Sequence, residues 1–362
     1  MGKKSNSKSK LFIIMIILVV AVVIVALGWY KTATSPVSQE SNMVEFEVEQ
    51  GAGLGQVAED LAKDGIIRDA NAAKIYNKLS GGIVLQAGTY ELDSSLDMKT
   101  ILSQISMGGV VDNSINLTFV EGEGVKEYAS VIANNTDNTA EDVYALMNDE
   151  AYIDSLINKY WFLTEDIKNS EIYYPLEGYL APNTYKFVDE KVSVQEIIET
   201  MLDQTEKELE PYRQQMENSS RSIHQIMTLA SVAEWEGKTS EDRAQIIGVF
   251  ENRLAKGMSL GSDVTTYYAF DVDMASSDLT VKQLNTANPY NTRGPGMEGK
   301  LPVGPIGNPS VDSIEATLNY TTTDAYYFVA DKNGKVYFTK TDAEHQAKVA
   351  ELKAAGLWHT YQ

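Results

Sequence analysis

Cysteine is missing from this chain of 362 residues, and histidine occurs only three times. The lack of cysteine excludes disulfides, thiolate nucleophiles, cysteine metal ligands and a lipid-modified cysteine. The histidines lie too far apart in the sequence to indicate shared ligation of a metal, at His224, His345 and His359. We therefore expect neither a metal nor another cofactor, which leaves carboxylate chemistry as the candidate for catalysis.

Positive charge is scarce outside the first 31 residues. The whole chain carries 30 basic and 51 acidic residues, a net charge of −21. Five lysines and no acidic residue lie in the first 31 positions, so the other 331 residues carry a net charge of −26. A body this acidic repels a nucleic acid backbone, and we expect no nucleic acid partner.

Charge is absent altogether from residues 11–30. At a rise of about 1.5 Å per residue, a helix of this length spans the ~30 Å hydrocarbon core of a bilayer. Lysines precede the segment and Trp29 and Tyr30 end it, so the positive-inside rule predicts a cytoplasmic tail at 1–10, a single-pass anchor at 11–30 and an extracytoplasmic remainder. The tail lysines are Lys3, Lys4, Lys8 and Lys10. A cleaved signal peptide is the alternative, although its apolar region is normally shorter.

An internal repeat organises the chain after a linker at 31–43. The segment Val48-Glu49-Gln50-Gly51 is followed by apolar residues. It recurs as Phe119-Val120-Glu121-Gly122, which is followed by apolar residues at the same spacing. Both copies show alternating apolar residues, a glycine turn and then apolar residues at helical spacing, which predicts strand, turn and helix twice. We expect a small α+β module at 44–110, with a further strand at 85–92 and a helix at 98–107.

The segment 111–362 is predicted to be a mainly helical domain with short strands. Helices are expected at 193–210, from about 223 to Gly237, from Thr239 to Gly257 and after Thr341, where cap residues frame apolar patterns. Asn333-Gly334 between residues 326–329 and 336–339 predicts a C-terminal hairpin. The fold class is therefore α+β with a single N-terminal transmembrane helix.

Glu234 is the candidate proton donor, in Leu229-Ala-Ser-Val-Ala-Glu234-Trp-Glu236-Gly. Small and apolar residues precede it, so its carboxyl is expected to be desolvated, and it lies at the negative end of a helix dipole. Both influences favour the protonated acid that a glycosidase needs near neutral pH. Glu236 lies about 200° further round a helix and cannot share the same cleft. The alternative is that Glu234 only pairs or caps at a helix end.

Two loops are unusually rich in tyrosines and amides. One is Leu176–Tyr185, and the other runs from Asn288 through Thr292 to the Pro/Gly-rich residues 301–309. Tyrosine faces stack on sugar rings and amides bond to hydroxyls, so these loops are candidates for an oligosaccharide cleft. Stiff connecting loops are the simpler interpretation of either loop alone.

In order along the chain, six segments resemble the MltG (YceG-like) endolytic murein transglycosylase family. They are Leu176–Tyr185, Leu229–Glu236, Val249–Asp263, Asn288–Thr292, Gly304–Pro309 and Tyr327–His345. The resemblance implies a membrane anchor, a LysM-like module at 44–110 and a YceG-like catalytic domain at 111–362. The sequence departs from the family's pattern at Ala181, Asn183, Gly261, Val264, Thr266 and Val336.

The resemblance also implies that Glu234 is the catalytic residue of a lytic transglycosylase. Such an enzyme cleaves the β-1,4 bond after N-acetylmuramic acid in nascent peptidoglycan strands and leaves 1,6-anhydro ends. Penicillin-binding synthases and the elongation machinery are the implied protein partners. The polar residues expected around the glycan are Glu177, Tyr179, Tyr185, Glu236, Asn252, Asp263, Tyr290, Asn291 and Asn308. A non-catalytic peptidoglycan-binding scaffold and a lysozyme-type hydrolase are the alternatives.

Overall fold

Helices dominate the regular structure of this protein, and short antiparallel strand pairs complete a mixed α+β fold, as the sequence predicts. The computed structural model describes residues 6–108 and 114–358. The chain divides into two units, unit 1 up to Asn113 and unit 2 from Ser114. Lys3, Lys4, His359 and the side chains of Lys8 and Lys10 lie outside the described residues.

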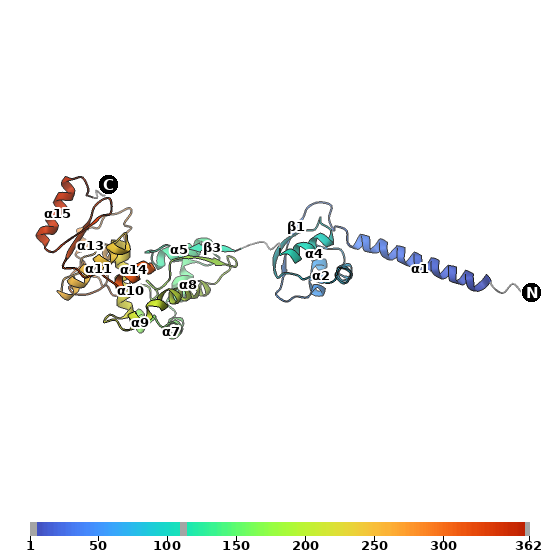
Figure 1. Ribbon diagram of the computed structural model, residues 1–362, viewed down its shortest axis with the longest axis horizontal. Coiled ribbons are helices and arrows are strands. Elements are labelled where there is room, and N and C mark those ends of the chain that lie inside the picture. Colours follow the sequence, from blue (N-terminus) through green and yellow to red (C-terminus); the bar gives the residue numbers. More distant parts are fainter. Residues whose placement is uncertain (1–5, 109–113, 359–362) are drawn as a thin grey trace, which may run out of the picture. The chain divides into compact units, whose positions relative to one another are not determined.

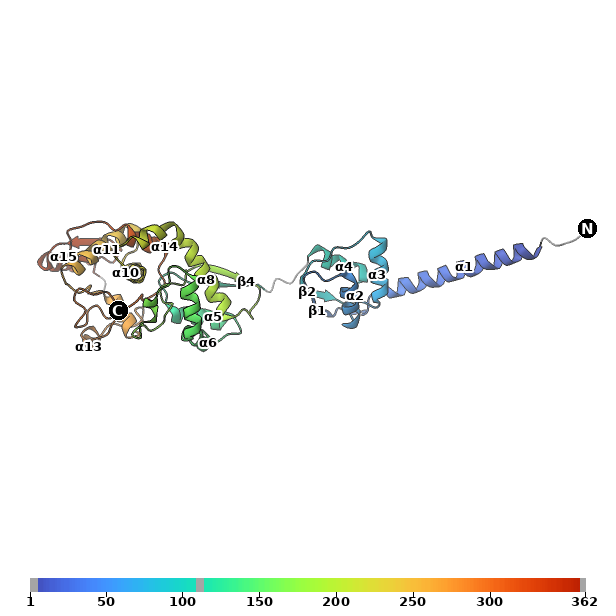
Figure 2. The same ribbon diagram turned by 90° about the horizontal axis from the view of Figure 1, so that it is seen from below.

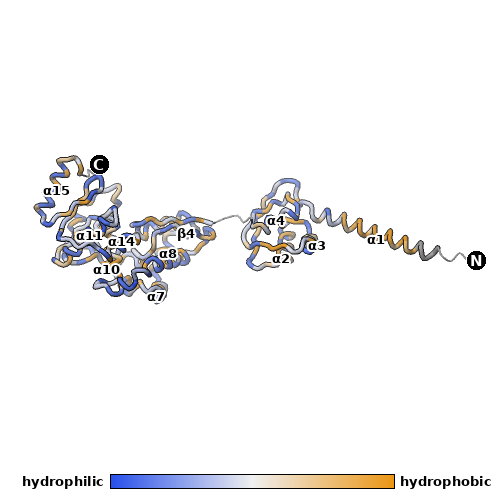
Figure 3. Tube along the Cα trace, viewed as in Figure 1, coloured by the Kyte–Doolittle hydropathy of each residue, from blue (hydrophilic) through white to orange (hydrophobic). Residues whose placement is uncertain are grey.

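The first helix, α1 (Asn6–Ala33), contains the predicted anchor. An 18-residue window within Leu11–Ala33 has a mean hydropathy of 3.5, and the helix is long and apolar enough to cross a membrane. Figure 3 shows the apolar colouring along this helix.

Unit 1 continues after α1 as strand, two helices, strand and helix. Strands β1 and β2 pair antiparallel, with Val48 opposite Gly88, and helices α2, α3 and α4 complete the unit (Figure 2). The predicted strand at 85–92 starts only at Gly88, because the Gln86 N–H donates instead to the Ile105 carbonyl of α4. The bounds are β1 Met43–Val48, α2 Leu54–Lys63, α3 Ala70–Leu79, β2 Gly88–Asp93 and α4 Met98–Met107.

The first part of unit 2 repeats the strand, turn and helix predicted from the sequence. Strand β3 pairs antiparallel with β4, and the helices around them share one apolar core that includes Phe119 and Tyr128. The bounds are β3 Ile115–Thr118, α5 Val125–Asn135, α6 Ala140–Met147, α7 Glu150–Lys159, η1 Glu165–Lys168, β4 Thr184–Phe187, α8 Val194–Leu209, η2 Glu210–Tyr212 and α9 Arg213–Glu217.

The second part of unit 2 is built on three helices, α10, α11 and α14, that pack against one another (Figure 1). Ser222, Thr239 and Ser310 cap their N-termini with side-chain hydrogen bonds. The predicted hairpin is present as β5 and β6, with Gly334 at φ +87° in its turn. The bounds are α10 Ile223–Glu236, α11 Ser240–Ala255, α12 Asp263–Ala269, α13 Val281–Leu284, α14 Val311–Leu318, β5 Tyr327–Ala330, β6 Val336–Thr339 and α15 Asp342–Ala354.

The packing of α11 depends on Gly248, because a Cβ there would lie 2.1 Å from the Thr321 carbonyl oxygen. We predict that Gly248→Ala lowers the free energy of unfolding of unit 2 by about 2 kcal/mol, the usual size of an overpacking penalty. Urea unfolding followed by tryptophan fluorescence measures this change. Gly55→Ala in α2 is the matched control, since its Cβ would meet only Lys74 Cε at 3.9 Å. Equal midpoints for Gly248→Ala and the parent would contradict this close approach.

Candidate active site

Glu234 lies in the last turn of α10, and both oxygens of its carboxyl are held by the protein. Its side chain is 6% exposed, which confirms the predicted burial. Oε1 accepts a hydrogen bond from Arg243 Nη2 at 2.5 Å. Oε2 accepts from the Ser310 N–H at 2.8 Å and from Ser310 Oγ at 2.6 Å.

The two partners of Glu234 come from the first turns of neighbouring helices. Arg243 belongs to α11, and its Nε donates to the Gly237 carbonyl at 2.9 Å in the short turn between α10 and α11. Gly237 leaves room for this contact, because a Cβ there would lie 2.7 Å from Arg243 Cγ. Ser310 is the N-cap of α14. The end of one helix and the starts of two others thus converge on one carboxyl.

The glycine turn (residues 121–124) lies beside Glu234. Trp235 Nε1 donates to the Gly122 carbonyl at 2.9 Å, and the Gly122 N–H donates to the Asn308 carbonyl at 2.7 Å. A Cβ at Gly122 would lie 3.4 Å from Glu234 Cγ. Glu121, in the same turn, has its pKa raised by burial and by the negative charge of Glu234. The carboxyls of Glu121 and Glu234 therefore interact electrostatically.

Glu236 is directed to a different part of the protein, as its helical position predicts. Its Oε1 accepts a hydrogen bond from Ser262 Oγ at 2.5 Å, and burial raises the pKa of its carboxyl. Asp263 follows Ser262 at the start of α12, where it is exposed and forms an ion pair with Arg293. These two acidic residues lie on the α12 side of α10 and do not contact Glu234.

Glu177 is buried, with 1% of its surface exposed. Its carboxyl accepts hydrogen bonds from the Val125 N–H at 3.0 and 3.3 Å and from the Tyr268 hydroxyl at 3.0 Å. Burial raises the pKa of Glu177 to about 8. The side chain joins the N-terminus of α5 to α12, so its contacts in the structure are internal.

The three tyrosines predicted to contact a sugar are buried as well. Tyr179 is 1% exposed, and its hydroxyl lies 2.8 Å from Nδ1 of His224. Since His224 Nε2 lies 2.9 Å from the Val303 carbonyl, which only accepts, Nδ1 is the acceptor for the tyrosine. Tyr185 donates to the Ala181 carbonyl, and Tyr290 packs against other tyrosine rings. All three rings lie in the protein interior, and their contact with a sugar stays a prediction.

The amides of the two unusual loops join backbone segments. Asn308 Oδ1 accepts from the Gly178 and Leu180 N–H groups, both at 3.0 Å, and its Nδ2 donates to the Glu123 carbonyl. Asn291 Nδ2 donates to the carbonyls of residues 283 and 286, and Asn252 Nδ2 donates to those of residues 323 and 325. Asn291 and Asn308 are fully buried. They bind the protein's own backbone where direct contacts with sugar hydroxyls were expected.

Two functional contacts escaped prediction from the sequence. Arg243 and Ser310 lie 9 and 76 residues from Glu234 along the chain. The sequence around Ser310, a cap residue before an apolar pattern, predicts the start of a helix. No local pattern connects Arg243 or Ser310 with Glu234.

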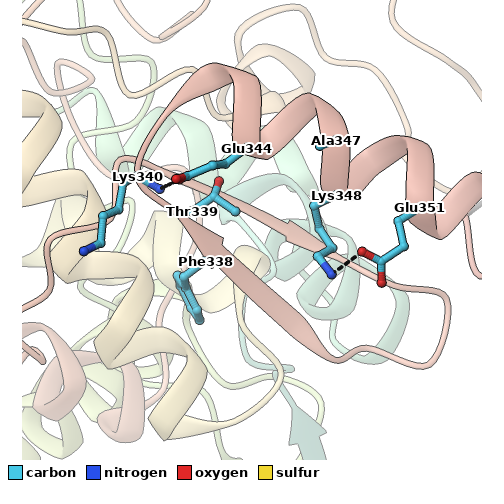
Figure 4. Close-up of a pocket in the computed structure, with 7 residues that line it drawn as sticks. All are labelled: Phe338, Thr339, Lys340, Glu344, Ala347, Lys348 and Glu351. Carbon is cyan, nitrogen blue, oxygen red and sulfur yellow. Dashed lines mark hydrogen bonds and ion pairs between the residues drawn. The ribbon is translucent and has the colours of Figure 1, made fainter.

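Two pockets of unit 2 lie away from Glu234. One, of about 410 Å³, lies between β6 and α15 and includes the Lys348–Glu351 ion pair (Figure 4). The other, of about 580 Å³, is lined by polar residues that include Gln214, Asn218 and Arg221. Among the described residues no three histidine, aspartate or glutamate side chains are grouped as metal ligands.

The chain is similar to a known family over most of its length. The YceG-like family model matches residues 46–351. A relative from Bacillus subtilis (strain 168), named endolytic murein transglycosylase, is 35% identical over 317 residues, which cover 87% of this chain and 86% of the relative. A relative of the same name from Streptococcus pneumoniae serotype 2 (strain D39) is 31% identical, and the match covers 85% of this chain and 58% of that protein. The crystal structure of a YceG-like protein from Listeria monocytogenes shares 33% identity at a TM-score of 0.60, covering 85% of this chain and 100% of that one.

The raised pKa of Glu177 predicts a pH-dependent stability. The folded protein binds this proton more tightly than the unfolded chain, in which the pKa is about 4.5. Its contribution to the free energy of unfolding is therefore complete below pH 4.5 and is lost as the pH rises to about 8. The loss is on the order of 5 kcal/mol, since the two pKa values differ by about 3.5 units and one unit corresponds to about 1.4 kcal/mol.

Glu177→Gln should flatten this decline, because the amide oxygen still accepts from the Val125 N–H but carries no charge. Urea unfolding of variant and parent at several pH values between 5 and 8 measures the difference. His224, whose pKa is lowered by burial, contributes with the opposite sign in both proteins and cancels. An unchanged slope in the variant would contradict the assignment.

Proposed function

The chain belongs to the YceG-like family, and we propose that it is an endolytic murein transglycosylase in which Glu234 is both acid and base. Its substrate is the peptidoglycan glycan strand. The observation that supports this most directly is the geometry of Glu234, a buried carboxyl fixed at both oxygens by Arg243 and Ser310. Fixed catalytic groups in a poorly hydrated site are what proton transfer to a sugar oxygen requires.

One carboxyl is sufficient for the chemistry. Glu234 donates its proton to the glycosidic oxygen as the bond to C1 of the muramyl residue breaks, and the leaving sugar keeps a hydroxyl. The carboxylate then accepts the proton of the C6 hydroxyl, whose oxygen bonds to C1. No water enters, so the products have the same total mass as the substrate, and one of them has a 1,6-anhydro end.

The other residues expected at the site act mainly by holding its loops. Glu177, Tyr179 and Asn308 connect the Leu176–Tyr185 loop to α5, to His224 and to the glycine turn through the contacts described above. Trp235, with 44% of its surface exposed beside Glu234, is the aromatic face that remains available to a sugar. Tyr185, Glu236, Asn252, Asp263, Tyr290 and Asn291 support neighbouring segments.

The electrostatic interaction of Glu121 with Glu234 makes hydrolysis the competing reaction. Two-carboxylate glycosidases use the second group to activate water or to attack the sugar. Glu121, whose protonation responds to the charge of Glu234, is the residue that would do this. Hydrolysis adds one water for each cut, so the mass of the products separates the two reactions.

The N-terminal helix holds the enzyme at the cell membrane. We assign its N-terminal side to the cytoplasm and units 1 and 2 to the outside, on the basis of the lysines before the span. Unit 1 is assigned as a LysM-like module, and the penicillin-binding synthases and elongation machinery as partners of the membrane-bound enzyme.

Replacement of Glu234 tests the proposed function. We predict that Glu234→Gln lowers the formation of 1,6-anhydro ends from purified, uncrosslinked glycan strands by at least about 10³-fold, because glutamine neither gives nor takes the proton. Mass spectrometry of the products measures this. Glu251→Gln is the matched control, since Glu251 is also partly buried and paired with an arginine, Arg221, at 2.5 Å.

Three results would overturn the proposal in different ways. Activity of Glu234→Gln at the level of the parent would remove Glu234 from the mechanism. Products heavier by one water per cut would identify a hydrolase. Binding of strands without new ends after prolonged incubation would identify a scaffold.

A further inference from the structure

If Glu234 acts as acid and base, as proposed above, one of its two oxygens must carry the proton. We propose that this oxygen is Oε1, and that Arg243 is a positioning residue that sets the pH range over which Glu234 transfers its proton. The inference rests on the proposed function for its kinetic consequences, but the protonation of Glu234 can be measured independently of activity.

The hydrogen bonds of the carboxyl indicate which oxygen is available. A carboxylate has about four lone pairs, two on each oxygen. The N–H and the hydroxyl of Ser310 occupy both positions on Oε2, at 2.8 and 2.6 Å. Among the described residues, Oε1 accepts a hydrogen bond from Arg243 alone, at 2.5 Å. Oε1 therefore has the lone pair to which a proton can bind without displacing a donor.

The guanidinium of Arg243 is itself fixed. Nε donates to the Gly237 carbonyl at 2.9 Å, Nη1 donates to Ser310 Oγ at 3.3 Å, and the side chain is only 12% exposed. Since the guanidinium is planar, these two contacts determine where Nη2 meets Oε1. A lysine at this position has a single nitrogen and could carry the charge without reproducing all three contacts.

Arg243 also sets the sign of the electrostatic field at the site. Four charged side chains act on the pKa of Glu121 in the glycine turn: Glu234 from α10, Arg243 from α11, Asp312 from α14 and Glu208 from α8. Arg243 is the positive member of this set. Without it, the Glu234 carboxylate lies among other carboxylates, and a proton binds to it more tightly.

The test is the pH dependence of transglycosylation, measured as kcat/KM between pH 4 and 9 on purified strands. We expect Arg243→Gln to shift the alkaline limb of the profile to higher pH by about one unit or more. This is the usual effect of losing an opposite charge at this distance. It should also lower the maximal rate, because the carboxyl loses its orientation. Arg243→Lys should keep the limb within a few tenths of a unit of the parent while its rate falls.

Arg221→Gln is the matched control. Arg221 pairs with Glu251 at 2.5 Å and is also partly buried, yet it does not contact Glu234. This variant should lose stability without moving the limb. If Arg221→Gln moves it equally, the effect is a general one of altered charge or packing, and the proposal is wrong.

A direct measurement separates this inference from the proposed function. In protein with ¹³C-labelled glutamate carboxyl groups, the Glu234 signal is identified by its loss in Glu234→Gln, and its titration midpoint is followed by NMR. We expect the midpoint to rise in Arg243→Gln, whatever reaction the protein catalyses. An unmoved midpoint overturns the role of Arg243, while an active Glu234→Gln overturns the proposed function.

If Arg243→Gln does not fold, Ser310→Ala carries the test. It removes the hydroxyl donor from Oε2 while the N–H remains, so Oε2 gains a free lone pair and the carboxylate loses one stabilising bond. The titration midpoint of Glu234 should then rise, but by less than in Arg243→Gln, which removes a full charge. No rise in this variant would show that the donors described here do not control the proton.

Discussion

The contact between the Glu234 carboxyl and Arg243 is the interaction on which the site depends. A charged group with so little exposure to water needs a partner, and removing one member of such a pair leaves an uncompensated charge. Here the partner, Arg243, comes from the next helix, α11. Ser310, at the start of α14, donates a further hydrogen bond to the carboxyl. The same contacts that satisfy the carboxyl therefore hold α10, α11 and α14 together, so the stability of this core and the geometry of the proposed reaction cannot vary independently.

A second set of contacts surrounds this centre and is made almost wholly by backbone groups and amides. Asn308 joins the Leu176–Tyr185 loop to the glycine turn, and the glycine turn in turn contacts Trp235. Glu177 anchors the same loop to the N-terminus of α5 from the other side. Buried backbone groups must find partners, and long loops without regular structure leave many of them unpaired. The abundance of asparagine and tyrosine in these loops is explained by this requirement before any ligand is considered.

Local patterns predicted the elements of this fold well, because caps and turns are local interactions. Thr239 and Thr341 start helices, and Asn333-Gly334 forms the hairpin turn. The burial of the Glu234 side chain followed from the small and apolar residues before it, and its separation from Glu236 followed from helical geometry. The positions of Tyr179 and Asn291 could not be obtained in this way. The sequence does not distinguish a side chain that bonds a group of the protein itself, such as His224 or a backbone carbonyl, from one that bonds a sugar. Only the packing of distant segments decides between them.

The two copies of the internal repeat have similar local sequences, but their glycine turns differ in what surrounds them. Both copies fold as strand, glycine turn and helix, and both turns contain a glycine with positive φ, Gly51 and Gly122. A Cβ at Gly51 would meet no described atom within 4 Å, whereas one at Gly122 would press against Trp235 and Glu234. The first turn could therefore accept side chains that also tolerate its backbone conformation, such as asparagine. The second is restricted by its contact with the site as well as by its backbone. Selection for catalysis would act on one copy of the same unit and leave the other free.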